Sequence, residues 1–450
     1  MVQQRFLSCL VIAAISVAAQ QARCEQAIRL VAAAPTGAVE AVSVELELGG
    51  QLQLPSTQEE SVENTPQITA NAKLEYDEAR LPGGETRSVR YYRTVEGTAT
   101  IAGRERPLAL RDSRRLVLAN GKLLTGVEGP LDREELELLQ TVADSLATGG
   151  LLPGRQVEIG DTWDHDVPTM EALLGVDSVG VCEVTSVLVE ANEHYARCQV
   201  AGTVHGVVDG SSVELELDGI YLYRRATEGI SHLNLAVRET RAIGPATPGC
   251  TMVTKVRMKR DLADDPQLTA DRIAKAQAAG AGAIEMVQLA SDHLGFTTST
   301  DHRWYVTGSL GDSMTLRRVT PEGLVAHGNL VRLEAKPLDA QAALGEFRRD
   351  VMRSLSQHSA GLKSESQWVN RNGCRVMEIV ATGTIEDVQV EWHCYQIAPP
   401  EGDEQLHRLA LSLMIESGQL ERLADQDRVL VDQLTLLPRA QQAQRPTRQK

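Results

Sequence analysis

The chain has 450 residues, with 61 acidic and 45 basic side chains, and a formal net charge of −16 at pH 7. An acidic surface repels phosphate backbones and anionic lipids, so nucleic acids and membrane surfaces are disfavoured as partners. Aromatic residues make up only 3% of the chain, which argues against a carbohydrate-stacking surface. A chain of this length is expected to form two domains of ordinary size, with three as the alternative.

The first residues have the pattern of a secretory signal peptide. Arg5 precedes a largely apolar run from Phe6 to Ala19, and the chain then turns polar. This run is shorter than the roughly 20 residues that a spanning helix needs, and small residues precede the predicted cleavage site after Ala19. We therefore assign residues 1–19 to a signal peptide. The expected product is an exported protein, periplasmic or extracellular, with no integral membrane segment after cleavage.

The cysteines are expected to form disulfides. The chain holds seven of them, and Cys9 leaves with the signal. An even number in an oxidising compartment favours disulfide pairing. Proximity predicts Cys374 with Cys394, and Cys182 with Cys198 across a hairpin turn near residues 191–192; Cys24 with Cys250 follows by elimination. No cysteine or histidine spacing typical of a zinc site occurs, and no cofactor is expected.

The N-terminal half predicts a large antiparallel sheet. Residues 20–66 read as a partly disordered segment with one strand candidate at 42–48. Within 67–261, alternating apolar and polar residues recur between turn signals, which favours a meander of antiparallel strands. A helix is expected over 131–146, where Asp132 can cap the first turn and leucines recur at helical spacing. The economical architecture is one helix packed on a large curved sheet.

The C-terminal half predicts a second domain. Residues 262–290 read as a helical linker, and 439–450 as a basic, disordered tail. Between them, 291–438 runs strand, strand, helix, hairpin pair, strand, helix. In the hairpin pair, residues 372–373 (Asn-Gly) form a turn signal. Folding the second hairpin about Thr384 places the two cysteines 374 and 394 opposite each other.

This second half resembles the PsbP/Mog1-like family of α/β/α sandwiches. The resemblance lies in Gly295-Phe296 ahead of Trp304, a late strand at 409–415 and a final helix around 423–434. It implies an α+β fold class, an antiparallel sheet in the sandwich, and a non-catalytic accessory or binding role. No functional residue transfers, because no diagnostic motif is present. The first domain, with Gly-Asp-Thr-Trp at 160–163, resembles secreted bacterial domains of unknown function.

Two groups of polar residues are candidates for chemistry. Asp161, Asp164 and His165 could bind a divalent cation, but neighbours on a strand point to opposite faces, so a solvated turn with Trp163 packed inward is the favoured interpretation. Acid–histidine neighbours at 292–293 and 301–302 could form a catalytic set with Ser291 or Ser299. No GxSxG motif supports a nucleophile there.

The leading hypothesis is an exported, non-enzymatic two-domain binding or accessory protein with an unknown protein partner. The alternative is a carrier of an apolar ligand, because a curved sheet with a helix laid on it can enclose a cavity. A metal-dependent hydrolase using residues 161, 164 and 165 is the third hypothesis.

Overall fold

The structure of the protein is a computed structural model that describes residues 27–33, 37–55, 65–82, 86–280, 286–334, 340–400 and 407–438. Strands account for 58% of it and helices for 16%. Nearly all strand pairs are antiparallel and belong to several large sheets. The chain is therefore mostly β, and the predicted α+β class is wrong.

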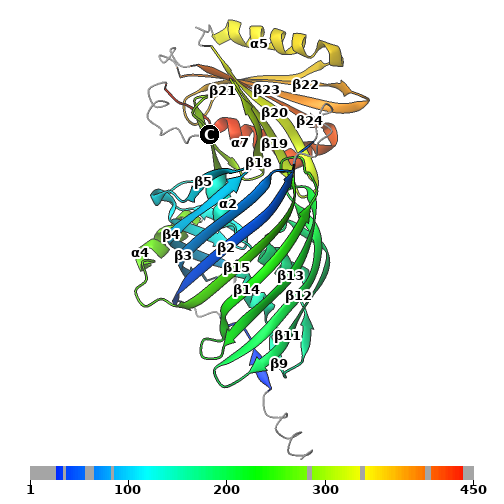
Figure 1. Ribbon diagram of the computed structural model, residues 1–450. Coiled ribbons are helices and arrows are strands. Elements are labelled where there is room, and N and C mark those ends of the chain that lie inside the picture. The colour runs from blue at the N-terminus through cyan, green and yellow to red at the C-terminus, as the bar shows by residue number, and fades with distance from the viewer. Residues whose placement is uncertain are drawn as a thin grey trace, which may run out of the picture.

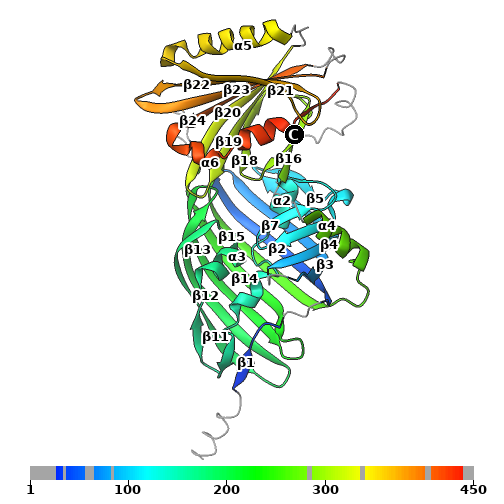
Figure 2. The same cartoon turned by 180° about the vertical axis from the view of Figure 1, so that it is seen from behind.

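A twelve-stranded antiparallel sheet forms the N-terminal half, in the order β10-β11-β12-β13-β14-β15-β2-β3-β4-β6-β7, with β5 paired to β4. It curves into a trough (Figures 1 and 2). Its strands are β2 (Val39–Gln53), β3 (Gln67–Arg80), β4 (Arg87–Ile101), β5 (Arg104–Ala109), β6 (Leu116–Asn120), β7 (Leu123–Gly126), β10 (Thr162–Asp164), β11 (Ser178–Ala191), β12 (Tyr195–Val208), β13 (Ser211–Arg224), β14 (Gly229–Arg241) and β15 (Gly249–Leu262).

Strand alternation sets which face of this sheet is buried. Along β13, Val213, Leu215 and Leu217 are buried, and the residues between them are exposed. Successive side chains of a strand point to opposite faces, so the apolar ones line the concave side. The segment predicted to be partly disordered contributes β2 to the middle of the sheet, between β15 and β3. Residues 1–26, which include the predicted signal peptide, lie outside the described residues.

Short elements fill the concave face of the trough. They are α2 (Arg133–Leu139), the 3-10 turn η2 (Ala147–Leu151), α3 (Val167–Leu174), and the two-stranded sheet of β1 (Ile28–Leu30) with β9 (Arg155–Val157). Leu139, Leu151 and Leu173 belong to one core cluster with the sheet's inward side chains. Figure 2 shows α3 lying within the trough. The concave face is therefore packed with protein side chains.

The helix predicted over 131–146 is shorter than expected. Asp132 caps it as predicted and forms a capping box with Glu135, but the helix ends at Leu139. Ala143 has φ +66, a left-handed conformation that an α-helix of L-residues cannot contain. Its N–H donates to the carbonyl of Leu173 at 2.7 Å instead. Tertiary contact with α3 therefore replaces the last turns of the predicted helix.

A seven-stranded antiparallel sheet forms the core of the C-terminal half, in the order β18-β19-β20-β24-β23-β22-β21. The helix α5 (Ala340–Ser354), followed by η3 (Ser356–His358), packs on one face. The strands are β18 (Trp304–Leu310), β19 (Ser313–Thr320), β20 (Gly323–Leu333), β21 (Gly361–Val369), β22 (Arg375–Ile385), β23 (Val388–Ala398) and β24 (Arg408–Glu416).

The other face of this sheet is covered by a mixed layer. It holds η4 (Ser417–Gln419), α6 (Leu420–Leu423) and α7 (Gln426–Asp432), and residues of β17 (Phe296–Asp301) and β25 (Thr435–Leu436) join the same core cluster. The region of the final helix predicted around 423–434 thus contains two short helices, α6 and α7, followed by the strand β25. Because strands share this layer, the predicted α/β/α sandwich is wrong.

A four-stranded sheet, in the order β25-β17-β16-β8, joins the two halves. β16 (Met286–Ser291) pairs in parallel with β8 (Leu131–Asp132) from the first half. The region predicted as a helical linker contains α4 (Ala270–Gly280), and its last residues belong to β16. The 3-10 turn η1 (Asp112–Arg114) lies between β5 and β6. The pairing of β16 with β8 therefore connects the two halves through main-chain hydrogen bonds, in addition to the covalent linker.

The register of the predicted cysteine hairpin is wrong. β22 and β23 turn at Glu386 and Asp387, which both have positive φ, as a type I′ turn requires. Cys394 therefore pairs with Ile379, five residues from its predicted partner Cys374. An odd shift moves a side chain to the other face of the sheet. The two cysteines lie in different core clusters.

The described cysteines are free thiols. Cys182 pairs across its hairpin with Val204, whereas Cys198 pairs with Leu188, so these two are also out of register with each other. The turn between β11 and β12 lies near residues 191–192 as predicted. Both predicted disulfides lack the juxtaposition of side chains that a bond requires. Cys24 lies outside the described residues.

Candidate functional site

The cluster predicted around Asp161 does not converge on one point. His165 is buried, and its Nε2 lies 2.8 Å from Ser186 Oγ; burial lowers its pKa. Asp164 is exposed, and Asp161 accepts the N–H of Glu158 at 3.0 Å. In the part of the chain that the structure describes, no three His, Cys, Asp or Glu side chains are placed to share a metal. Trp163 is buried as expected and donates to the carbonyl of Leu151 at 3.0 Å.

The second group of acids and histidines is engaged in other contacts. Asp301 lies 3.3 Å from His302 Nδ1, but its other oxygen accepts a hydrogen bond from Arg318 at 2.8 Å. The hydroxyl of Ser291 accepts the N–H of Leu294 at 3.1 Å. Asp301, His302 and Ser291 are therefore not arranged as a catalytic relay.

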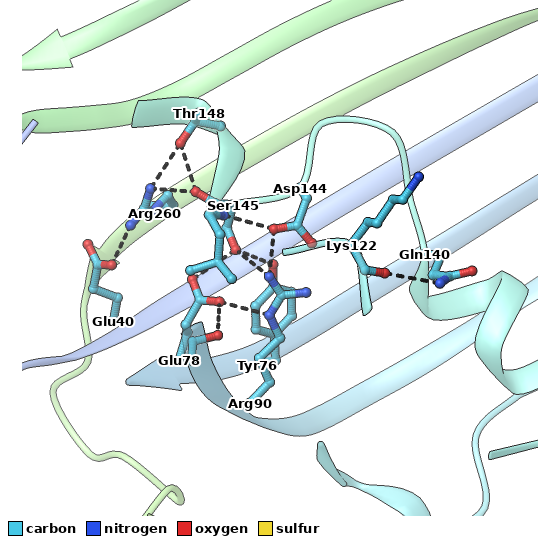
Figure 3. A network of polar contacts seen from close by, with 12 residues as sticks. Glu40, Tyr76, Glu78, Arg90, Lys122, Gln140, Asp144, Ser145, Thr148 and Arg260 are labelled. Carbon is cyan, nitrogen blue, oxygen red and sulfur yellow. Dashed lines mark hydrogen bonds and ion pairs between the residues drawn. The ribbon is translucent and has the colours of Figure 1, made fainter. Parts of the chain in front are cut away.

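A buried network of charges, which the sequence did not reveal, lies on the concave face of the large sheet (Figure 3). Glu78 accepts hydrogen bonds from Arg90 Nε at 2.8 Å and from Ser88 at 2.9 Å through one oxygen, and from Ser145 at 2.8 Å through the other. Arg90 also donates to Asp144 at 2.7 Å. Burial raises the pKa of Glu78, but the charges of Arg90 and Arg260 more than offset this, leaving a pKa of about 2.

Arg260 extends the network toward η2. It donates to the carbonyl of Ser145 at 3.0 Å and to Thr148 Oγ1 at 3.1 Å, and it pairs with Glu40. These contacts fasten the segment 144–148 to strands β2, β3, β4 and β15. Because the carboxylates and guanidinium groups are paired with each other, the network stabilises the filling of the trough and leaves little capacity for acid–base chemistry.

A cavity of about 480 Å³ adjoins this network. Its lining includes three residues of the network, Glu40, Thr148 and Arg260. It also includes Arg224 and Asp261, which form an ion pair at 2.6 Å. Its lining is rich in charge, and the apolar side chains of the trough are packed against each other. These features do not favour the hypothesis of an apolar ligand in the concave face.

A smaller cavity of about 240 Å³ lies at the open edge of the seven-stranded sheet. β21 is the end strand there, and among the described strands it pairs only with β22. The lining comes from Ala343 of α5, from Gln367, Val369, Arg375, Met377 and Ala398 on the α5 side of the sheet, and from Trp368 and Val376, whose side chains belong to the core of the opposite face. Most of these side chains are apolar. An edge strand with unpaired main-chain groups therefore borders an apolar cavity.

β21 is held firmly from the opposite face. Trp368 donates through Nε1 to Asp432 of α7 at 2.8 Å, and Arg428 lies over its ring at 5.3 Å. Next to it, Tyr395 donates to Asp427 at 2.7 Å, and His393 Nδ1 lies 2.6 Å from the same oxygen. Burial lowers the pKa of His393, but the Asp427 and Glu391 carboxylates outweigh it and leave the pKa raised. These contacts pre-organise the edge strand.

Comparison with known proteins identifies no family. No family model matches the sequence, and no curated protein matches it. Among solved structures, a Bacteroides thetaiotaomicron protein is 10% identical, covering 34% of this chain and 49% of its own, with a TM-score of 0.24. Lipovitellin, from a study of its lipid–protein interactions, is 9% identical over 53% of this chain and 27% of its own, with a TM-score of 0.28. This chain thus spans about half of the first and about a quarter of the second.

A Pseudomonas aeruginosa protein of unknown function is 16% identical over 36% of this chain and 99% of its own, with a TM-score of 0.21. Overlaps at such TM-scores do not define a shared fold, so function is argued from this chain's own residues. None of these three structures is named as a PsbP or Mog1 protein, and that resemblance stays a prediction. In the described ranges no helix combines the length and apolarity needed to cross a membrane.

Proposed function

We propose that this protein is an exported, non-enzymatic binding protein that takes up an extended segment of a protein partner along β21. An unpaired strand edge offers alternating N–H and carbonyl groups, to which an extended peptide can add as a further strand. The main support is that the unpaired edge of β21 and an apolar cavity lie side by side on the same strand. Main-chain bonds would give affinity, and the cavity would select a side chain.

The other sheet ends of the described chain are less suited to this role. β10 and β7, the ends of the large sheet, have 3 and 4 residues, whereas β21 has 9. Short end strands are a common way to avoid pairing with other chains. β18, at the other end of the seven-stranded sheet, has 7 residues, and its Trp304 carbonyl already accepts a hydrogen bond from Arg133 at 2.9 Å. β21 is thus the longest of these ends.

Selection from a phage-displayed library of random nine-residue peptides tests the proposal with the mature protein. Bound peptides should be extended, and hydrogen exchange should slow in the amides of 361–369. Val369 is 63% exposed on this edge, and Val369→Lys should weaken binding at least tenfold, because a lysine there opposes strand addition. Leu310→Lys on β18, at a residue 87% exposed, is the matched control and should change affinity less than twofold.

Three outcomes would overturn the proposal. They are failure to select any peptide, protection from exchange confined to residues outside β21, and equal effects of the two lysine substitutions.

A further inference from the structure

Among the described residues that line the cavity beside β21, one is charged, Arg375 at the beginning of β22. Its Nε is buried and has no hydrogen-bond partner among the described residues. Arg375 is half-buried, and within the described ranges no carboxylate lies within ion-pair distance of it, whereas the buried Arg90, Arg260 and Arg318 each have one. Leaving a buried N–H of a guanidinium unsatisfied is costly. Arg375 therefore lies in this cavity without a counter-charge among the described residues.

The neighbouring charges do not complete it. Glu365, the acid of β21 on the same face, pairs with Arg348 of α5 at 3.3 Å. Glu378 of β22 points to the opposite face, where it pairs with Arg428 and accepts a hydrogen bond from Ser366 at 2.7 Å. Both acids are already engaged, so the partner of Arg375 has to come from outside these contacts.

Strand geometry places Arg375 within reach of an added strand. Arg375 pairs with Val369, the last residue of β21, and shares its face of the sheet. A peptide added outside β21 would project every second side chain onto this face, at a spacing of about 7 Å. One such side chain would meet the apolar wall formed by Val369, Met377 and Ala398, and the next would lie toward the guanidinium.

We infer that the partner segment carries a glutamate or aspartate two positions from an apolar residue, and that Arg375 binds this side-chain carboxylate. The inference rests on the proposed strand addition and names the chemistry that it selects. A guanidinium presents parallel N–H groups that match a carboxylate in a bidentate pair. Arg375 is half-buried, and the apolar side chains on one side of it exclude part of the water that would compete for this pair.

Fluorescence anisotropy with synthetic peptides tests the inference on the mature protein. The probe is a fluorescein-labelled nine-residue peptide of alternating threonine and valine, with one leucine and, two positions away, one glutamate; its C-terminus is amidated. A second peptide carries glutamine in place of the glutamate. A third carries the glutamine and a free C-terminal carboxylate. The wild-type protein should bind the glutamate peptide at least tenfold more tightly than the glutamine peptide.

Arg375→Gln should reduce the affinity for the glutamate peptide to that for the glutamine peptide, and should leave the latter within twofold of its wild-type value. Arg375→Glu should reverse the preference toward a peptide with lysine at the same position, which a merely unfolded variant cannot do. The double-mutant combination isolates the pair from general effects on folding.

The outcomes separate this inference from the function on which it rests. Equal binding of the glutamate and glutamine peptides, with slowed exchange at β21, overturns the acidic preference and leaves strand addition standing. Tight binding of the free-carboxylate peptide alone also overturns it, because Arg375 would then recognise a chain terminus. Displacement of the probe by laurate in an Arg375-dependent way, with Val369→Lys inert, overturns both and supports a small apolar acid as the ligand. Failure of all three peptides to bind overturns both as well.

Discussion

Replacing Glu78 by glutamine should destabilise the protein by about 3–4 kcal/mol at neutral pH. The pKa of Glu78 is lowered from 4.5 to about 2, which at roughly 1.4 kcal/mol per pKa unit corresponds to about 3 kcal/mol of stability. Removing one partner of a buried ion pair independently suggests about 3–5 kcal/mol. Glutamine keeps the shape of the side chain, so the loss reports the charge that holds Arg90 and Ser145.

The pH dependence gives the sharper test. Because the folded pKa is lowered, the stabilisation is present above pH 4.5 and is lost as the pH falls toward 2. At pH 3 only about 1 kcal/mol of it should remain, so the wild type and Glu78→Gln should converge in acid. Urea unfolding followed by circular dichroism at pH 7 and pH 3 measures both differences.

A control and a contrary result complete this test. Glu75 lies on the same strand and pairs with Lys73 at 2.8 Å, but both side chains are partly exposed. Glu75→Gln should therefore cost less than about 1 kcal/mol. The reasoning would be refuted if Glu78→Gln lowered the free energy of unfolding by less than about 1 kcal/mol at pH 7, or by the same amount at both pH values. The network would then not be what holds segment 144–148 against the large sheet.

Three further predictions follow from the packing. Asp427→Asn should lower the pKa of His393 in an NMR titration, because the Asp427 carboxylate helps to keep that pKa raised. The stability that protonated His393 gives is present below pH 6.5 and is lost as the pH rises through the folded pKa. An unchanged pKa of His393 in the variant would contradict this reasoning. Cys374 and Cys394 should both be alkylated without prior reduction, as peptide mapping can show. A disulfide-linked peptide would instead support the register that places these two cysteines opposite each other. Gly50→Ala should lower the free energy of unfolding by about 1–3 kcal/mol, because an added Cβ would lie 2.2 Å from the Thr251 carbonyl oxygen. Gly49→Ala is the control: its Cβ would meet no atom within 4 Å, so it should be nearly neutral in thermal unfolding.

Local patterns in the sequence predicted what depends on neighbouring residues. The alternation in 212–224 indicated a strand, and the turn near 191–192 was placed correctly because the two strands beside it pair with each other. The capping of α2 by Asp132 was also predictable, since it involves Glu135 only three residues away. In each case the determining contact lies close by in the chain.

Most of the failures have long-range causes. The helix after Leu139 is interrupted by a contact with α3. The register of β22 with β23 has a local cause, because the chain turns at Glu386 and Asp387, which carry no Asn-Gly signal, and not at Thr384. The hydrogen-bond partners of Glu78 lie 10 to 67 residues away along the chain. No local signal indicates such a network, or which strand ends a sheet.

The two ends of β21 differ in a way that bears on its role. Near its beginning a bulge interrupts the pairing between Leu362 and Ser364, and Lys363 lies within it, paired with Glu391 at 2.6 Å. A bulge and a lysine are both features by which natural edges avoid pairing with other chains. From Ser364 to Val369 the pairing is regular, and this stretch borders the apolar cavity and Arg375. Protection at one end and a recognition surface at the other would confine an added strand to about six residues and align it, so that a glutamate in the partner reaches the guanidinium in only one register.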